Sequence, residues 1–233
     1  MKDFLVMNDI QLHYVEQGQG EPLILLHGNG ENCGYFEHQI PCFCHDYHVI
    51  ALDTRGHGQS PRGEKPFTIK QFAEDLKDFM DEKGIEKAIL LGFSDGGNIA
   101  MEFALEYPQR VEKLVLNGAN LFPSGVKPLY QWPVEIGYRI AKLFSKKSDK
   151  AMKNAEMLGL MVNEPHIEPA DLAQLSMPVL VVAGTKDMIK ESHTKLIYNN
   201  LPNAQLSILE GDHFVANKNP EAFNTIVETF LAS

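Results

Sequence analysis

The chain has 233 residues, of which 44% are hydrophobic and 22% are charged, and its formal net charge is −10. These proportions exclude a disordered or coiled-coil chain, and the length is enough to bury a sizeable core without disulfides or metals. The excess of acidic over basic residues gives a negative charge that repels phosphate backbones, so we expect no nucleic-acid partner.

The sequence also predicts a cytoplasmic protein with no membrane partner. No apolar run approaches the roughly 20 residues that a membrane-spanning helix needs. The first 17 residues interrupt their apolar positions with polar ones and lack the apolar core of a signal peptide. The three cysteines, Cys33, Cys42 and Cys44, are an odd and sparse set that does not indicate a disulfide framework.

Short apolar runs alternate with longer amphipathic segments along most of the chain. This alternation predicts a largely parallel sheet with helices on both faces. Residues 2–7 and 10–16, separated by Asn8 and Asp9, are expected to form an antiparallel hairpin. The remaining expected strands are residues 22–27, 48–53, 88–93, 111–117, 178–183 and 204–210. Together these segments predict a mostly parallel sheet of eight strands.

Helices are expected between the strands. Thr68 is a typical N-cap residue, and the apolar positions after it repeat with helical spacing until Gly84. Similar patterns predict helices over residues 98–107, 189–200 and 220–231.

The alternation stops between about residues 121 and 175, where prolines mark both ends of a stretch with two helical patterns. We interpret residues 122–170 as a small helical cap inserted into a core of residues 1–121 and 171–233. The insert has seven basic and five acidic residues, so it carries +2 and the remainder of the chain carries −12. We attribute the excess to solvated lysines on helix backs rather than to a patch for an anionic partner.

Residues 92–96, with the sequence GFSDG, fit the pattern G-x-S-x-G. An expected strand leads into this segment and a helical pattern follows it. That context predicts a sharp turn that lifts the hydroxyl of Ser94 above the edge of the sheet. Gly92 and Gly96 suit such a turn because larger side chains would clash across it. Ser94 is therefore a candidate nucleophile.

A serine hydroxyl is a weak nucleophile and needs a base that is oriented by an acid, in the chain order Ser, acid, His. Asp187 follows the strand expected at 178–183, and His213 follows the strand expected at 204–210. Both lie at the sheet edge that carries Ser94, which is where open α/β sheets bind ligands. We predict that Ser94, Asp187 and His213 form a catalytic triad.

The oxyanion of an acyl-transfer intermediate needs hydrogen-bond donors. A glycine-rich turn, His27-Gly28-Asn29-Gly30, follows the strand expected at 22–27. We predict that the backbone N–H groups of Asn29 and Asp95 are the donors. Three side chains are candidates for contact with the substrate: Asp95, through a cationic substrate group, and Met157 and Met161, as pocket walls.

Other polar residues receive structural interpretations. Asp212 adjoins His213 and is less well placed than Asp187 to face its ring, and His193 is expected to be solvated on a helix face. His57 precedes Ser94, contrary to the expected order, so its segment is predicted to shape a turn beside the site.

A cluster of possible metal ligands precedes the strand expected at 48–53. Its spacing differs from that of structural zinc sites, so we predict neither a metal nor a cofactor. The residues of this cluster are Cys42, Cys44, His45 and His48.

The motifs HGNG, DTRGHGQS, GFSDGG, GTKD and GDHF resemble those of the α/β-hydrolase superfamily in order and spacing. The resemblance covers nearly the whole chain outside the cap. It implies the α/β-hydrolase fold, with the predicted triad as catalytic residues and residues 122–170 as the lid. Within the superfamily, GFSDGG with a short lid resembles the biphenyl-hydrolase-like and valacyclovirase group of serine esterases. Ser94 disfavours haloalkane dehalogenases and epoxide hydrolases, in which an Asp is the nucleophile.

We therefore expect a cofactor-independent serine hydrolase that cleaves a small ester, thioester or amide through an acyl-enzyme. Two alternatives remain open because a fold does not determine a reaction. One is a carbon–carbon bond hydrolase or lyase with the same triad, and the other is a non-enzymatic receptor for a small molecule. Repeated turnover of an activated ester would favour an enzyme. The sequence leaves monomer and homodimer equally open.

Overall fold

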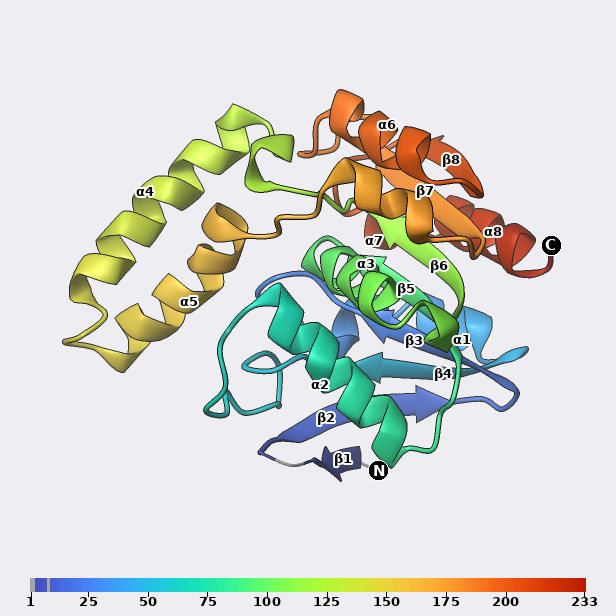
Figure 1. Cartoon of the computed structure of the whole chain (residues 1–233), viewed down its shortest axis with the longest axis horizontal. Helices are drawn as coiled ribbons and strands as arrows, with labels where there is room; N and C mark the ends of the chain where they lie inside the picture. The colour runs from blue at the N-terminus through green and yellow to red at the C-terminus, as the bar shows by residue number, and fades with distance from the viewer. Residues whose placement is uncertain (1–2, 8) are drawn as a thin grey trace.

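The computed structural model describes residues 3–7 and 9–233, which include one sheet of eight strands with helices on both sides (Figure 1). The sheet therefore has the predicted number of strands. Two residues of the expected first hairpin, Lys2 and Asn8, lie outside the described part. The strands are β1 (Asp3–Val6), β2 (Gln11–Gln17), β3 (Glu21–Leu26), β4 (Tyr47–Leu52), β5 (Ala88–Phe93), β6 (Val111–Asn117), β7 (Val179–Gly184) and β8 (Ala204–Leu209).

The order of the strands across the sheet is β1-β2-β4-β3-β5-β6-β7-β8. The pairs β1–β2 and β2–β4 are antiparallel, and all pairs from β4 to β8 are parallel. This order confirms the predicted mostly parallel sheet. Strands β3, β5, β7 and β8 end at one edge, so the segments that follow them come together there.

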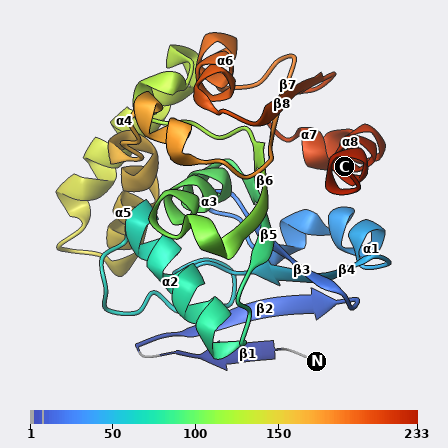
Figure 2. The same ribbon diagram turned by 45° about the vertical axis from the view of Figure 1, so that its right-hand side comes forward.

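Two helical layers enclose the sheet (Figures 1 and 2). Apolar residues of α2, α3 and α6 share one buried cluster with the strands, and those of α1, α7 and α8 share the other. The helices in these layers are α1 (Gln39–Phe43), α2 (Ile69–Glu82), α3 (Asp95–Glu106), α6 (Glu191–Asn200), α7 (Val215–Lys218) and α8 (Pro220–Leu231).

Strand β3 shows why the strands read as continuous apolar runs. Leu23 and Leu25 point into the cluster with α1 and α8, whereas Ile24 and Leu26 point into the cluster with α2 and α3. All four side chains are buried. Successive strand residues point to opposite faces, so a sheet covered on both faces needs apolar residues at every position.

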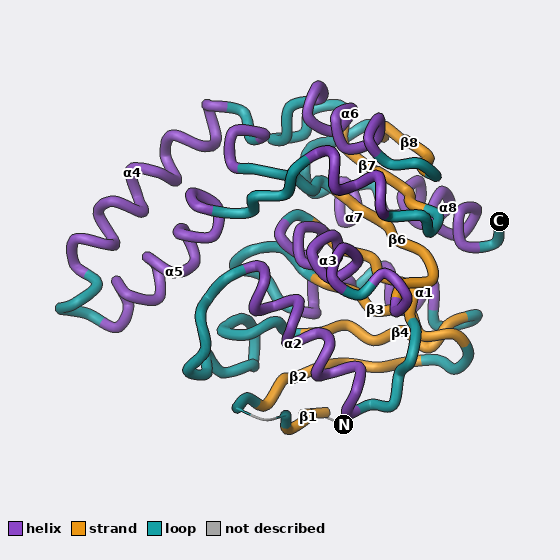
Figure 3. Tube along the Cα trace, viewed as in Figure 1, coloured by secondary structure: helices purple, strands orange, loops and turns teal. Residues whose placement is uncertain are grey.

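Helices α4 (Pro128–Phe144) and α5 (Asp149–Asn163) form a helical hairpin that projects beyond the sheet (Figures 1 and 3). Both lie in the segment that the sequence analysis interprets as the cap. The hairpin is held to the rest of the chain by the burial of Leu160 in the cluster with α2 and α3, and by polar contacts such as the bond from Ile69 N–H to Glu164 Oε2 (2.6 Å). Among the described residues, no helix has the length and apolar character needed to cross a membrane.

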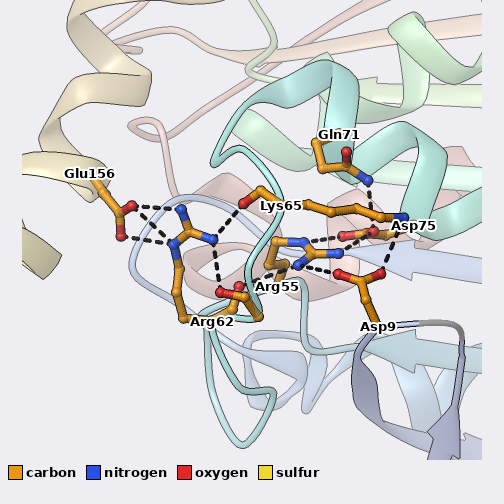
Figure 4. A network of polar contacts seen from close by, with 8 residues as sticks. Asp9, Arg55, Arg62, Lys65, Gln71, Asp75 and Glu156 are labelled. Carbon is orange, nitrogen blue, oxygen red and sulfur yellow. Dashed lines mark hydrogen bonds and ion pairs between the residues drawn. The ribbon is translucent and has the colours of Figure 1, made fainter.

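Arg55 anchors the loop after β4 against α2 (Figure 4). Its guanidinium is fully buried and donates to both carboxylate oxygens of Asp75 at 2.7 Å, and to Asp9 at 3.3 Å. In the same loop, Arg62 donates to both carboxylate oxygens of Glu156 on α5. The loop therefore links the N-terminal hairpin, α2 and the α4–α5 hairpin, which is the turn-shaping role that the sequence analysis gives this segment.

Asp75→Ala is expected to lower the free energy of unfolding by about 3–5 kcal/mol, because it leaves a buried guanidinium without its main partner. Urea denaturation monitored by circular dichroism measures the change. Asp81→Ala is the matched control on the same helix. Asp81 is partly exposed and pairs with Lys77 and Arg110, so its loss should cost less than about 1 kcal/mol. Equal losses in the two variants would contradict the anchoring role of Arg55.

Candidate active site

Ser94 occupies a strained turn between β5 and α3. Its backbone has φ 52° and ψ −120°, and among the described residues it is the one non-glycine residue with positive φ. Such a conformation costs on the order of 1–3 kcal/mol and persists only where neighbouring structure imposes it. Here, Ser94 N–H donates to Asn117 O at 2.8 Å. A Cβ atom at Gly96 would lie 2.0 Å from the carbonyl oxygen of Leu26, so this turn requires glycine there.

The structure brings Ser94, His213 and Asp187 together. Nε2 of His213 lies 3.0 Å from Ser94 Oγ, and Nδ1 lies 2.7 Å from Asp187 Oδ1. Backbone N–H groups of Ile189 and Gly184 donate to the Asp187 carboxylate at 2.9 and 3.3 Å and hold it in place. A carboxylate at Nδ1 favours the tautomer with hydrogen on that nitrogen, which leaves Nε2 free to accept the serine proton.

Two backbone N–H groups next to Ser94 are available to a ligand. Asp95 is the first residue of α3, and its N–H has no acceptor within the helix. The N–H of Asn29, in the turn after β3, donates to no protein acceptor in the described part of the chain. The Asn29 side chain instead donates to the carbonyl oxygen of Met157 at 2.7 Å. An anion beside Ser94 would also lie at the positive end of α3.

The carboxyl group of Asp95 is buried beside Ser94 and incompletely paired. Its Oδ1 accepts from Asn98 Nδ2 at 3.2 Å, whereas its Oδ2 is buried and has no hydrogen-bond partner among the described residues. Burial raises the pKa of Asp95 to about 6, with a further rise from the charge of Glu164 and partial compensation from Asn29 and Asn98. Ionised Asp95 therefore lacks the hydrogen bonds that would normally stabilise a buried carboxylate.

A second carboxyl near Ser94, that of the half-buried Glu31, was not predicted from the sequence. It lies in the turn that carries Asn29, and its Oε2 is buried with no hydrogen-bond partner in the described part of the chain. Burial raises the pKa of Glu31 to about 7, and the nearby charge of His213 partly offsets this rise. No sequence signal marked Glu31, because a glutamate between Gly30 and Asn32 is typical of an exposed turn.

Met157 and Met161 lie on α5 in different surroundings. Met157 lines a cavity of about 320 Å³ between α5 and the loop after β4, together with Phe67, Met152 and the ion pair of Arg62 and Glu156. Met161 is not among the lining residues of this cavity, and its carbonyl oxygen accepts from Gln131 at 3.2 Å. The sequence predicts both methionines as pocket walls, whereas only Met157 lines this cavity.

His193 corrects one prediction. Instead of being solvated it is buried, and its Nε2 accepts from the Leu121 N–H at 2.9 Å. Burial lowers its pKa to about 4. The residues after β6 pack over α6, and Gly125 approaches so closely that a Cβ atom there would lie 2.7 Å from the ring. This contact joins segments about 70 residues apart, so the helical pattern of α6 alone does not reveal it.

The remaining polar residues have partners away from Ser94. Asp212 accepts from Phe214 N–H at 3.0 Å and pairs with Lys218. His57 stacks on Phe67, and its Nδ1 lies 3.0 Å from the Arg55 carbonyl oxygen. Burial lowers the pKa of His57 to about 4.

Two residues of the cysteine and histidine cluster at the start of β4 contact glutamates rather than one another. Cys42 Sγ donates to Glu228 at 3.1 Å, and His48 Nε2 lies 3.0 Å from Glu16. The described residues that could hold a metal are a different set, with ligand atoms within 4.8 Å of one another: His13, Cys33 and Asp53.

Hydrogen bonds already occupy this second set. The Asp53 carboxylate accepts from the backbone N–H groups of Cys33 and Gln59 at 2.7 and 2.8 Å, and its Oδ2 lies 2.8 Å from His13 Nδ1. Burial raises the pKa of the Cys33 thiol to about 12, so the thiolate that a metal needs is disfavoured. These contacts fit a cluster that fixes the loops around β2 and β4.

Comparison with known proteins identifies one family and several relatives. A family model described as "alpha/beta hydrolase fold" matches residues 21–146, more than half of the chain. The chain is 28% identical to 3-oxoadipate enol-lactonase 2 of Acinetobacter baylyi, over 99% of this chain and 96% of that protein. It is also 28% identical to serine hydrolase BPHL of Homo sapiens, over 97% of this chain and 85% of that protein. It is likewise 28% identical to 2-hydroxy-6-oxo-6-phenylhexa-2,4-dienoate hydrolase of Burkholderia cepacia, over 97% of this chain and 93% of that protein.

Asp95→Asn is expected to stabilise the protein at pH 7.5 by on the order of 3 kcal/mol, and by less at pH 4.5. The folded chain holds the Asp95 proton up to about pH 6, against 3.8 for an unburied aspartate. The stability contributed by this group is therefore present below about pH 4 and lost as the pH rises to about 6. Asparagine removes the buried charge and this pH dependence.

Urea denaturation of both proteins at the two pH values measures the difference. Asp46→Asn, at an exposed position, is the control and should change stability by less than about 0.5 kcal/mol at either pH. A stability difference between wild type and Asp95→Asn that is the same at both pH values would contradict the raised pKa.

Proposed function

The chain belongs to the alpha/beta-hydrolase family, and we propose that within it the protein is a serine hydrolase that cleaves small carboxylic esters. The same acyl-enzyme mechanism can also hydrolyse thioesters and amides. In this proposal Ser94 is the nucleophile, His213 the general base and Asp187 the acid that orients the imidazole. The likeness to BPHL confirms the resemblance to the biphenyl-hydrolase-like group.

The observation that carries the proposal is the continuous hydrogen-bonded chain from Ser94 Oγ through His213 to Asp187, with distances of 3.0 and 2.7 Å. Nucleophile and base are within proton-transfer reach, and the base is held by a third group. The strained backbone of Ser94 supports the same assignment, because stored strain is concentrated at functional sites.

The reaction has two steps. His213 Nε2 takes the Ser94 proton as Oγ attacks the carbonyl carbon, and the imidazolium then protonates the leaving group as the carbon–oxygen bond breaks. In the second step His213 takes a proton from water as the water oxygen attacks the acyl carbon, and returns it to Ser94 Oγ as the bond from the acyl carbon to Oγ breaks, which releases the acid and free Ser94. In both steps we propose that the N–H groups of Asn29 and Asp95 bind the oxyanion.

We propose that residues 122–170 act as a lid on a core of residues 1–121 and 171–233. The cavity of about 320 Å³ beside Met157 is the proposed substrate pocket, and Met161 does not line it. Its volume suits a small ligand. The bond from Asn29 to the Met157 carbonyl oxygen supports a link between pocket and oxyanion turn.

Carbon–carbon bond hydrolysis is a second candidate function. The likeness to 2-hydroxy-6-oxo-6-phenylhexa-2,4-dienoate hydrolase, at the same identity as the enol-lactonase, favours it. The two candidates differ in the bond cleaved, so a substrate panel separates them. Saturable binding without turnover on any member of the panel would instead indicate a receptor.

Ser94→Ala is expected to fold normally and to lose hydrolysis by a factor on the order of 10⁴ to 10⁶ in kcat, because the groups of a triad act as a unit. The measurement is steady-state turnover of activated esters, lactones and vinylogous diketones. Ser192→Ala, at an exposed position on α6, is the matched control and should keep wild-type activity. Comparable turnover by Ser94→Ala, free of contaminating esterase, would reject Ser94 as the nucleophile.

Asp95 is proposed to bind a cationic substrate group, such as the α-amino group of an amino-acid ester. Its buried, unpaired Oδ2 supports this role, since a cation would supply the missing partner. Asp95→Asn is expected to lower the preference for such an ester over its des-amino analogue by about 30-fold or more in kcat/KM. In wild type the preference should be larger at pH 7 than at pH 5, because Asp95 ionises at about pH 6.

Glu31→Gln is the matched control for the Asp95 variant, because it neutralises the other buried carboxyl near Ser94. It should keep most of the preference for the amino-acid ester. If Asp95→Asn keeps the wild-type preference and Glu31→Gln loses it, the cation site lies at Glu31 instead.

A further inference from the structure

Helix α4 presents a row of large apolar side chains to solvent. The members of this row, called here the α4 stripe, are between 56% and 77% exposed. They are spaced by three, four, four and three residues, which places them within about 80° of one another around a helix. The α4 stripe consists of Leu129, Trp132, Ile136, Ile140 and Leu143. A contiguous apolar surface of this kind marks an interaction site.

The α4 stripe lies on the side of the helix that faces away from α5. On the opposite side Gln131 and Ala141 are buried. A Cβ atom at Gly137 would lie 3.3 Å from Leu158, and Tyr138 lies against Gly159. The hairpin is therefore packed through its inner face, and within the described residues the stripe has no partner.

We propose that the α4 stripe binds the same stripe of a second copy, in an antiparallel pair with a twofold axis beside Ile136. The spacing of the stripe is symmetric about this residue, so antiparallel pairing sets Leu129 opposite Leu143 and Trp132 opposite Ile140. Ile136 meets its own equivalent. Such self-complementarity is what an isologous twofold interface requires, because each copy contributes the same surface.

The charges beside the stripe fit the same arrangement. Glu135 and Arg139 lie on one flank of the stripe, four residues apart. A twofold axis places equivalent flanks next to each other, so Glu135 of each copy approaches Arg139 of the other. The interface then contains two reciprocal ion pairs.

The basic tip of the hairpin also favours antiparallel pairing. Residues 139–153 contain six exposed basic side chains and one acidic side chain. This tip lies far from the sheet, whereas the start of α4 lies near α6 (Figure 1). Antiparallel helices bring the tip of one copy toward the body of the other, and the chain outside residues 122–170 carries −12.

A groove borders the stripe on the side of α5, next to the residue that faces Trp132 of the second copy. It has a volume of about 380 Å³ and runs between α4 and α5, lined by Ile140, Phe144, Ala151 and Leu158 among others. Ile140 is the residue that faces Trp132 of the second copy. The indole packs against this residue within the interface, and a buried tryptophan of this kind typically dominates the binding energy.

The first experiment is sedimentation velocity over a range of concentrations. Wild type is expected to form a dimer. Ile136→Glu places two carboxylates together on the twofold axis and should raise the dissociation constant at least about 100-fold. Val6→Glu is the matched control, because Val6 is a similarly exposed apolar residue on the edge strand β1 and should leave the dimer intact. Circular dichroism verifies that both variants are folded.

Charge reversal tests the antiparallel geometry. Arg139→Glu places a glutamate beside Glu135 of the other copy on both sides of the axis, and this repulsion should weaken the dimer by about tenfold. Adding Glu135→Arg to the same chain restores opposite charges across the axis and should recover wild-type affinity. Trp132 is the one tryptophan of the sequence, so a blue shift of its emission with increasing concentration reports its burial in the interface.

Three results would overturn the proposal. One is a monomeric wild type at concentrations up to about 100 μM, where even a weak dimer forms. Another is a dimer that Val6→Glu dissociates and Ile136→Glu does not. The third is a monomer whose Trp132 emission shifts on vesicles of phosphatidylglycerol but not of phosphatidylcholine, since the stripe and lysines would then serve an anionic lipid surface.

Discussion

The close approach of α3 to the end of β3 is the contact on which the geometry around Ser94 depends. Gly96 lies so near the carbonyl oxygen of Leu26 that a Cβ atom at this position would be 2.0 Å from it. With α3 in this position, Ser94 must leave β5 through a left-handed turn, and the free N–H of Asp95 points into the same region as the turn that carries Asn29. The proposed nucleophile and oxyanion donors thus depend on one contact between main-chain segments.

The carboxyl groups near Ser94 lower the stability of the folded chain when they are ionised. Within the described residues, Asp95 and Glu31 each have a buried carboxylate oxygen without a partner, and burial raises the pKa of both. A chain selected for stability alone would place neutral or apolar side chains at these positions, because an unpaired buried charge is costly. Under the proposed function, the cost is offset when a cationic substrate supplies the partner that Asp95 lacks.

The α4–α5 hairpin links the proposed site to the proposed dimer. Its inner helix, α5, contacts the loop after β4 through Glu156 and Arg62, and the oxyanion turn through Met157 and Asn29. Its outer helix, α4, carries the exposed stripe. Leu160 of α5 is also buried in the apolar cluster that α2 and α3 share with the sheet. A second copy bound to α4 would therefore contact the same hairpin that bounds the proposed pocket.

The sequence by itself determined the features that depend on local patterns. The eight strands and the helices on both faces follow from apolar runs and helical spacing, because burial on two faces demands a characteristic order of residues. The turn at Ser94 follows from glycines on either side of a serine between a strand and a helix. The convergence of Ser94, Asp187 and His213 could also be anticipated, because parallel strands bring their carboxyl ends to one edge.

The tertiary structure alone decided which residues are enclosed by segments distant in the chain. His193 is buried by the residues after β6, and Glu31 is buried beside His213. Asp53 is the acceptor that joins His13 and Cys33. For α4, the helical pattern shows apolar residues around much of the helix, and only its packing on α5 determines which of them stay exposed. Burial and pairing depend on contacts across tens of residues, and a local pattern carries no information about them.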